Sequence, residues 1–227
     1  MTQSEARHIF VGDVHGCLDE LTLLLKEVRF GADDVLVLVG DLVAKGPDSA
    51  GVVALAREYR ARSVCGNHDE AVLRHIRAVR AGEPLPHLKK QHARVAQALS
   101  PADWDYLLAM PLWLRFDALG VAVVHAGVLP DVPLEAQDPR NLITMRTIRP
   151  DGTASPKLSE GALWATRYTG PPHLVFGHDA ITGLQLHAHA TGLDTGCVYG
   201  GALTALLMPE RRVVSVPATR VHHEAKP

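Results

Sequence analysis

The sequence predicts an α/β fold in which central β-sheets are flanked by helices and a metal site lies at the carboxyl ends of the strands. The first observation is that apolar runs of strand length alternate with runs of helical spacing in the N-terminal part. The second is that parallel strands point their carboxyl ends toward one edge, where side chains from distant segments can meet. The third is that five short apolar runs, HIFVGDVHG, VLVLVGD, SVCGNHD, VAVVHAG and LVFGH, deliver Asp13, His15, Asp41, Asn67, His125 and His178.

The first elements form a βαβ unit. Strand 8–12 is followed by a helix over about 16–29, whose leucines recur at helical spacing, and then by strand 35–39. A turn after Asp41 leads to a second apolar-periodic helix from Val52 and to strand 63–65. This alternation predicts mostly parallel strands joined by right-handed crossovers.

The next segment, 70–118, is expected to be mainly helical and to cover the sheet. One helix ends at the glycine of EAVLRHIRAVRAG, and KKQHARVAQAL resumes the pattern. Ser100, Pro101 and Asp103 provide an N-cap, a first-turn proline and an acid at the third position, which predict the start of another helix.

The C-terminal half carries shorter elements. Strands are expected at 121–124 and 174–176, separated by an irregular segment over 128–170 that is rich in Pro, Gly, Asp and Arg. Short strands near 184–188, 203–207 and 212–216 then predict an antiparallel extension, so that the sheets are mixed.

Length and composition indicate one globular domain over residues 1–217, with a flexible tail at 218–227. The chain has 227 residues, of which 47% are hydrophobic and 21% charged. A formal net charge of -2 gives no basic field for non-specific nucleic-acid binding. Most of the 13 histidines, His92 and His222 among them, stand in polar or helical contexts and are expected to be solvated.

The compartment is expected to be the cytoplasm. Three cysteines without paired spacing favour a reducing environment. No apolar run approaches the roughly 20 residues needed to span a bilayer, and the N-terminus lacks a signal-peptide pattern.

The residues at the strand ends suit a pair of divalent ions. Carboxylates and imidazoles bind such ions, and two ions held about 3.5–4 Å apart need one bridging carboxylate. Asp41 is the expected bridge, with Asp13 and His15 on one ion. Either GDVHG or GNHD alone is read equally well as a turn, but five such motifs in order favour a built site.

GDVHG, GDLVAKGPDS, GNHD, HAG and GH together resemble the metallophosphoesterases related to the serine/threonine protein phosphatases (the PPP superfamily), over nearly the whole chain. The resemblance implies a calcineurin-like fold and a binuclear metal centre, with manganese expected first and cobalt, iron or zinc as alternatives. It places Asp13, His15 and Asp41 on one ion, and Asp41, Asn67, His125 and His178 on the other.

This centre implies hydrolysis without a protein nucleophile. A water that bridges two cations has its pKa lowered toward neutrality, so hydroxide can attack phosphorus while the ions neutralise the phosphoryl oxygens. His68 matches the family's histidine that protonates the departing oxygen, and Asp41 is the second expected catalytic residue.

The second motif narrows the substrate. Protein phosphatases of the family have GDxVDRG, where this chain has Ala44 and Lys45. Their aspartate orients the acid histidine, and its loss matters least for a leaving group such as a nucleoside diphosphate, whose terminal oxygen has a pKa near about 6. GDLVAKGPDS, LDTGCVYGGALTAL and NLITMRTIRP are similar to the ApaH-type symmetrical diadenosine tetraphosphatases, which implies cleavage of diadenosine tetraphosphate into two ADP.

Three alternatives remain open. They are a phosphoprotein phosphatase acting on Ser, Thr or Tyr, a pyrophosphatase acting on capped RNA or polyphosphate, and an inactive metal-binding scaffold. The scaffold is disfavoured because all six ligand positions are intact.

Cationic and aromatic residues are expected around the substrate. Lys45 and Arg146 are the strongest candidates for the phosphates, Asn67 and Arg167 are also assigned to substrate binding, and Arg149 is a further candidate. Trp164, Tyr168 and Tyr199 are candidates for base stacking, against an equal expectation that they pack a loop. Asp194 is a weaker candidate for supporting a histidine ligand.

Overall fold

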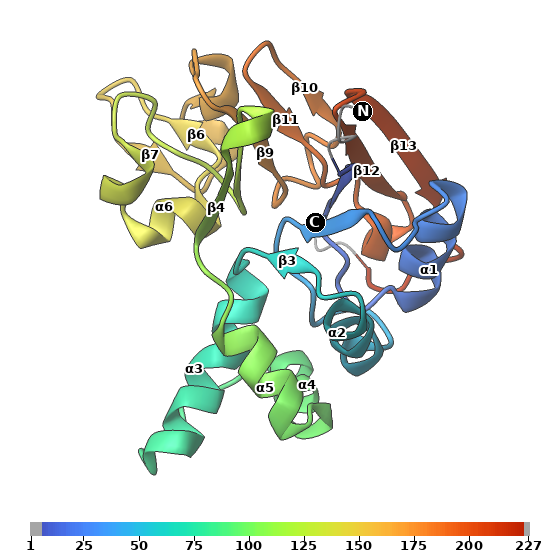
Figure 1. Cartoon of the computed structure of the whole chain (residues 1–227). Helices are drawn as coiled ribbons and strands as arrows, with labels where there is room; N and C mark the ends of the chain where they lie inside the picture. Colours follow the sequence, from blue (N-terminus) through green and yellow to red (C-terminus); the bar gives the residue numbers. More distant parts are fainter. Residues whose placement is uncertain (1–5, 225–227) are drawn as a thin grey trace.

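The computed structural model describes residues 6–224, which fold into two five-stranded mixed sheets, a small three-stranded sheet and six α-helices (Figure 1). The helices are α1 (Leu18–Glu27), α2 (Ser49–Glu58), α3 (Asn67–Ala81), α4 (Lys90–Ala98), α5 (Pro101–Leu108) and α6 (Pro139–Thr144). The expected α/β class with mixed sheets flanked by helices is confirmed.

The first sheet has the strand order β13-β12-β1-β2-β3. Its parallel part is β1 (His8–Val11), β2 (Val35–Leu38) and β3 (Arg62–Ser63), as the βαβ pattern predicted. The antiparallel part is β12 (Ala202–Met208), which pairs with β1, and β13 (Arg212–Pro217) at the edge. Two strands of the predicted antiparallel extension, near 203–207 and 212–216, therefore join the N-terminal βαβ unit, whereas the one near 184–188 lies in the other five-stranded sheet.

The second sheet has the order β10-β11-β9-β5-β4. Its parallel strands are β5 (Val121–Val124), β9 (His173–Phe176) and β11 (Ala190–Gly192). The outer strands β10 (Gln185–Leu186) and β4 (Trp113–Phe116) are antiparallel. Both sheets thus contain a parallel trio, and each trio supplies strand ends to the candidate site.

The two sheets pack face to face. Phe10 and Val37 from the first sheet share one apolar cluster with Val123 and Val175 from the second. A second cluster joins the outer face of the first sheet to α1, α2 and the helices that follow, and a third joins the outer face of the second sheet to the segment around Trp164. Figure 1 shows α3, α4 and α5 as a helical group at one end of the molecule.

Two regions differ from the sequence-based expectation. Strand β4 lies inside 70–118, which was expected to be helical, because Trp113–Phe116 pairs with β5. The segment 128–170 was expected to be irregular, but it contains α6 and a small sheet of β7 (Ala154–Ser155), β6 (Thr147–Ile148) and β8 (Ala162–Leu163). Two-residue strands are too short to give a sequence period.

The expected tail at 218–227 is packed against the protein as far as the structure describes it. The backbone N–H groups of His222 and His223 donate to the carbonyl of Val198, and Thr219 donates to Glu20. Residues 225–227 lie outside the described part. Among residues 6–224, no helix has the length and apolar character needed to cross a membrane.

Candidate metal centre and substrate cavity

The predicted strand-end side chains come together between the two sheets. Asp13 and Asp41 follow β1 and β2, Asn67 begins α3 after β3, and His125 and His178 follow β5 and β9. Each of these strands is parallel to its neighbour in the group, so their carboxyl ends meet at one edge. The structure therefore brings together the polar side chains that end the apolar runs of the sequence.

Asp41 lies at the middle of the group. One of its carboxylate oxygens is 3.5 Å from His15 Nε2, and the other is 3.6 Å from His125 Nε2. Asp41 also belongs to two sets of metal-binding atoms, one with Asp13 and His125 and the other with His15 and His68. Asn67 Oδ1 lies 3.2 Å from His125 Nε2. The donor set fits two adjacent cations that share one carboxylate.

Each of the three strand-end histidines has one ring nitrogen held by a backbone carbonyl. His15 Nδ1 is 3.2 Å from Val43 O, His125 Nδ1 is 2.9 Å from Val39 O, and His178 Nε2 is 3.1 Å from Thr144 O. A carbonyl can only accept, so that nitrogen carries the proton and the other nitrogen is left with its lone pair. Metal-binding histidines are oriented in this way.

Burial shifts the pKa values of the histidines and of Asp13 in this group. Burial lowers the pKa of His15, His125 and His178, so each imidazole is neutral. Burial and the neighbouring carboxylates of Asp194 and Asp41 raise the pKa of Asp13. A bound cation would remove the cost of holding these carboxylates together.

Asp41 is affected in the opposite direction. Burial alone would raise its pKa, but attraction to His125, His68 and His15 in their protonated forms, and to the Lys45 cation, holds the pKa of this carboxyl well below its usual value. The backbone N–H of His68 also donates to Asp41 Oδ1 at 2.8 Å. Asp41 is therefore the carboxylate that stays ionised in the group.

The loops hold these side chains with unusual backbone conformations. His15, Asp41 and His178 have φ values of 48°, 51° and 69°, in the left-handed region that non-glycine residues seldom occupy. Gly66 and Gly177 approach the carboxylates of Asp41 and Asp13 so closely that a Cβ at either position would clash. This explains why glycine recurs beside the ligands in GNHD and GH.

Asp69 connects the GDLVAKGPDS and GNHD motifs through hydrogen bonds. It is fully buried and accepts from the N–H groups of Leu42, Val43 and Gly66. Burial, with the nearby charge of Asp41, raises its pKa to about 7. Its role is visible in the sequence only as the acid at the third position of α3, which is typical of a helix start.

His68 has an imidazole partner. Its Nδ1 atom lies 3.0 Å from Nε2 of His92, which projects from α4, and its ring stands edge-on to His15. Burial lowers the pKa of His68 to about 4. The expectation that His92 is solvated is wrong. The signal in the sequence was its position on the apolar face of α4, in register with Val95, Ala96 and Leu99, which are all buried.

A cavity of about 670 Å³ opens beside these residues. Lys45 lines it, with Nζ 2.8 Å from His15 Nε2 and 5.2 Å from the ring centre of Tyr199. Arg146 also lines it and donates to the carbonyl of His178 at 3.0 Å. The remaining lining includes Asp13, His15, Asp41, Asn67, His68, His178 and Asp194.

Two of the candidate arginines lie away from this cavity. Arg167 is exposed and is not part of the cavity wall, so it does not meet the other predicted site residues. Arg149 is paired with Glu160 in the small sheet. The predicted substrate contact at Arg167 therefore stays a prediction, and the structure places this residue outside the cavity wall.

The aromatic candidates separate in the same way. Trp164 is buried and donates from Nε1 to Ala126 O at 3.0 Å, and Tyr168 packs beside it and donates to Pro172 O. Both therefore pack a loop, and Tyr199 alone of the three lines the cavity. Asp194 interacts with Asp13 and accepts from Gly196 N, so it supports a carboxylate and not a histidine.

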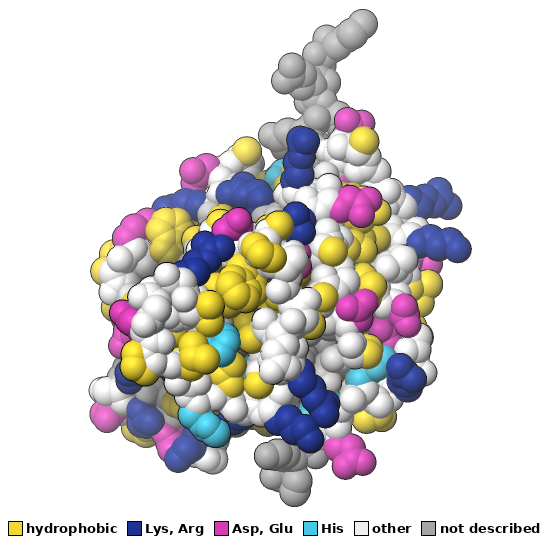
Figure 2. Space-filling model, turned by 90° about the horizontal axis from the view of Figure 1, so that it is seen from below, with side chains coloured by type: hydrophobic (Ala, Val, Ile, Leu, Met, Phe, Trp, Pro, Cys, Tyr) yellow, Lys and Arg dark blue, Asp and Glu magenta, His cyan; other side chains and the backbone are white. Residues whose placement is uncertain are grey.

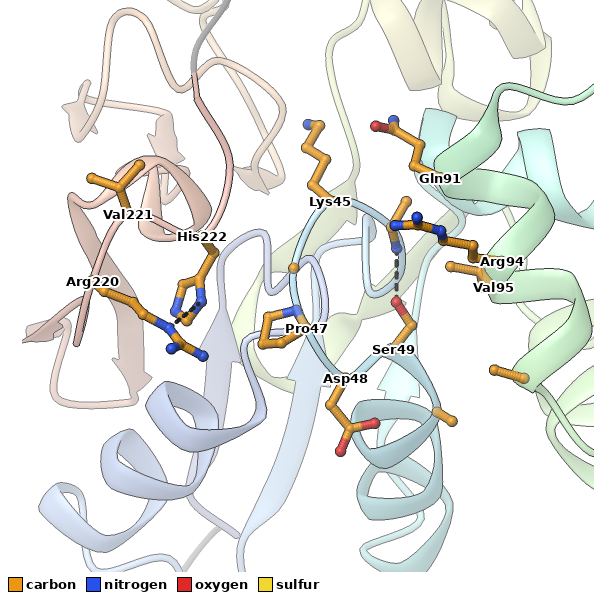
Figure 3. Close-up of a pocket in the computed structure, with 14 residues that line it drawn as sticks. Lys45, Pro47, Asp48, Ser49, Gln91, Arg94, Val95, Arg220, Val221 and His222 are labelled. Atoms are coloured by element: carbon orange, nitrogen blue, oxygen red, sulfur yellow. Dashed lines mark hydrogen bonds between the residues drawn. The ribbon is translucent and has the colours of Figure 1, made fainter.

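A second cavity, of about 540 Å³, shares Lys45 and Gln91 with the first. Figure 3 shows the loop of Pro47, Asp48 and Ser49 between Arg220 and His222 on one side and Arg94 on the other. Elsewhere, Figure 2 shows Lys and Arg side chains interspersed with Asp and Glu over the face it displays. The basic side chains that could meet an anionic substrate are therefore those that line the two cavities.

Comparisons with known proteins agree with this geometry. Residues 6–208 match the calcineurin-like phosphoesterase family. The chain is 30% identical over 240 residues to an asymmetrical bis(5'-nucleosyl)-tetraphosphatase of Geobacillus thermodenitrificans, covering 93% of this chain and 94% of the relative. It is 32% identical over 279 residues to the symmetrical bis(5'-nucleosyl)-tetraphosphatase of Yersinia enterocolitica, covering 94% and 92%.

A solved structure is similar over the same extent. It is that of a candidate diadenosine tetraphosphatase, which is 40% identical and covers 96% of each chain with a TM-score of 0.86. The family implies divalent metal ions, which agrees with the donor set around Asp41. The chain belongs to the calcineurin-like metallophosphoesterases and is a hydrolase of that family.

Proposed function

We propose that this protein hydrolyses dinucleoside tetraphosphates with two divalent ions, and that it cleaves diadenosine tetraphosphate symmetrically into two ADP. The observation that carries the proposal is the position of Asp41, whose two carboxylate oxygens face His15 and His125 in a shared cluster. Two adjacent cations require a carboxylate that lies between two groups of ligand side chains.

The proposed ligands divide around this carboxylate. Asp13, His15 and Asp41 would hold one ion, and Asp41 with Asn67, His125 and His178 would hold the other. Bound there, two divalent cations supply positive charge to the phosphoryl oxygens and make water a better nucleophile at neutral pH. Manganese is the ion we expect first, and cobalt, iron or zinc suit the same nitrogen and oxygen donors.

The protein's own side chains then orient the substrate and handle the proton. Lys45 and Arg146 line the cavity with positive charge and would bind the phosphates that do not react. His68 lines the same cavity and is neutral when the cavity holds no anion, and the negative charge of a bound polyphosphate would raise its pKa so that it can protonate the departing oxygen of the nucleoside diphosphate. Asn67 contributes its amide to the substrate as well as to the proposed ion.

The shape of the site supports a long substrate. The two cavities meet at Lys45 and Gln91, so a molecule longer than a phosphomonoester can extend from the centre over the loop of Pro47 and Ser49. The named relatives are tetraphosphatases, which supports a dinucleotide. Symmetrical cleavage is supported by the resemblance of GDLVAKGPDS to the symmetrical enzymes.

Product analysis tests this proposal. The full chain, reconstituted with Mn²⁺, is incubated with diadenosine tetraphosphate in ¹⁸O-labelled water. The nucleotides are then separated and their masses are measured by mass spectrometry. We expect ADP as the only product, with the label in half of it. Formation of ATP and AMP in equal amounts would show that cleavage is asymmetrical and would overturn the proposed symmetrical cleavage.

The competing substrates are tested in the same assay. A phosphoprotein phosphatase would turn over phosphoserine, phosphothreonine or phosphotyrosine peptides with higher kcat/KM than the dinucleotide. A pyrophosphatase that acts on capped RNA or polyphosphate would have a higher kcat/KM for those substrates than for the dinucleotide. Either result would overturn the proposed substrate and leave the metal centre in place.

A further inference from the structure

A second group of metal-binding side chains lies outside the candidate centre. Cys17 precedes α1, Glu20 is in the first turn of α1, and Cys197 begins a short 3-10 helix, Cys197–Tyr199. One donor atom from each of these residues lies within 4.8 Å of the other two, and all three residues are buried. Two thiols and a carboxylate form a donor set that the hydrolytic reaction does not use.

One atom of this group has no partner. Glu20 Oε1 accepts from Thr219 N at 2.9 Å, from Thr219 Oγ1 at 2.6 Å and from His222 Nε2 at 2.8 Å. Glu20 Oε2 is buried and has no hydrogen-bond partner among the described residues. A buried, unpaired carboxylate oxygen is costly, so its retention beside two thiols needs an explanation.

We propose that Cys17, Glu20 and Cys197 bind a structural divalent cation of the Zn²⁺ class. The ligand atoms are the two Sγ atoms and the free Oε2 of Glu20. Zn²⁺ accepts sulfur, nitrogen and oxygen at tetrahedral sites, whereas hard ions such as Mn²⁺ prefer oxygen. On binding, each thiol loses its proton to water and the sulfur donates its electron pair to the ion.

The distances suit this ion. A Zn–S bond of about 2.3 Å in a tetrahedron separates two sulfur ligands by about 3.8 Å. The observed upper limit of 4.8 Å therefore requires only small side-chain movements. A disulfide between Cys17 and Cys197 is the other chemistry that two close thiols allow, but it would leave Oε2 of Glu20 without a partner.

The site would join three segments that matter for the centre. Cys17 lies two residues after His15, Cys197 lies three residues after Asp194, and Glu20 accepts a hydrogen bond from His222 of the C-terminal segment. An ion held by all three would fix the loops that present His15 and Asp194. It would also stabilise the folded chain in proportion to its occupancy, since the unfolded chain does not hold the donors together.

Cobalt substitution distinguishes this site from the catalytic centre. The full chain is purified under reducing conditions, stripped of metal and titrated with Co²⁺, and its near-ultraviolet absorption is recorded. Sulfur-to-cobalt charge transfer requires thiolate ligands, and the proposed catalytic ligands are all oxygen and nitrogen. The readout therefore does not depend on hydrolysis or on the proposed function.

The matched variants are Cys197→Ser and Cys65→Ser. Cys65 is also buried, but its thiol donates to Gly66 O and it is not in the cluster. We expect the charge-transfer band in the wild type and in Cys65→Ser, and its loss in Cys197→Ser, with one bound Zn²⁺ fewer per chain by elemental analysis.

The proposal is overturned if the wild type shows no band, if Cys197→Ser keeps it, or if thiol counting in the reduced preparation finds a bond between Cys17 and Cys197. Should Cys197→Ser fail to fold, Glu20→Gln keeps both thiols. This variant should bind Co²⁺ at least about 10-fold more weakly in competition with a chelator. Equal affinity would show that the carboxylate is not a ligand.

Discussion

The Nδ1 atom of His68 lies 3.0 Å from the Nε2 atom of His92. The sequence predicted that the acid histidine lacks the aspartate of the protein phosphatases, because Ala44 stands in its place. In the structure, an imidazole from α4 contacts His68 instead. A neutral imidazole holds the ring without the negative charge that a carboxylate would bring.

We therefore expect His92 to be a positioning residue, whose removal affects protonation more than binding. We expect His92→Ala to lower kcat about 10-fold or more for substrates with basic leaving groups, since a general acid contributes about 10²–10⁴-fold and must be oriented to do so. KM should change little. The measurement is kcat and KM for a series of aryl and alkyl phosphates that differ in leaving-group pKa.

Two further variants make this test specific. His92→Gln keeps a hydrogen-bonding group and should recover part of the lost kcat, and His87→Ala removes an exposed histidine nearby in the sequence and should have no effect. An equal loss for all leaving groups would indicate that His92 only packs α4 against the site.

Asp41→Asn should abolish turnover. The substitution preserves the shape of the side chain but removes the charge that faces both His15 and His125, so we expect kcat to fall by more than about 100-fold and metal content to fall with it. Asp33→Asn is the matched control, because Asp33 is exposed and remote from the cavity. Full activity in Asp41→Asn would contradict the bridging role.

Arg146 and Arg167 provide a paired test of the substrate cavity. Arg146 lines the cavity and Arg167 does not, although the sequence offered both. Loss of a charge-assisted contact to phosphate costs about 1.5–3 kcal/mol, so Arg146→Gln should lower kcat/KM for diadenosine tetraphosphate by about 10- to 100-fold. Arg167→Gln should remain within about twofold of the wild type, and a comparable loss there would place the substrate across the small sheet.

The strand ends were predictable because each depends on a local pattern. An apolar run followed by Gly-Asp, Gly-Asn-His or His-Ala-Gly identifies both the strand and the ligand, and parallel pairing then brings Asp13 and Asp41 together whatever the intervening helices do. The same logic placed His125 and His178, which follow neighbouring strands of the second sheet.

Contacts between distant elements were not predictable in this way. His92 meets His68 only because α4 packs against α3, and the helix pattern does not say which neighbour its apolar face will find. Trp113–Phe116 became a strand because β5 offered an edge, not because of its own period. The burial of His222 depends on Glu20, a residue 202 positions away in the sequence.

Acid stability should report on Glu20 and the C-terminal segment. Burial alone would raise the pKa of Glu20, but hydrogen bonds from His222 and Thr219 lower it from 4.5 to about 2. A carboxyl whose pKa is lower in the folded state stabilises the fold above its unfolded pKa and loses that contribution as pH falls toward 2, by a few kcal/mol at most. The free energy of unfolding of metal-free protein should therefore fall more steeply between about pH 5 and pH 3 in the wild type than in Glu20→Gln. Glutamine cannot titrate, so the Glu20→Gln variant lacks any contribution from this group. If the free energy of unfolding fell with pH equally in both proteins, Glu20 would not be the group whose protonation destabilises the fold.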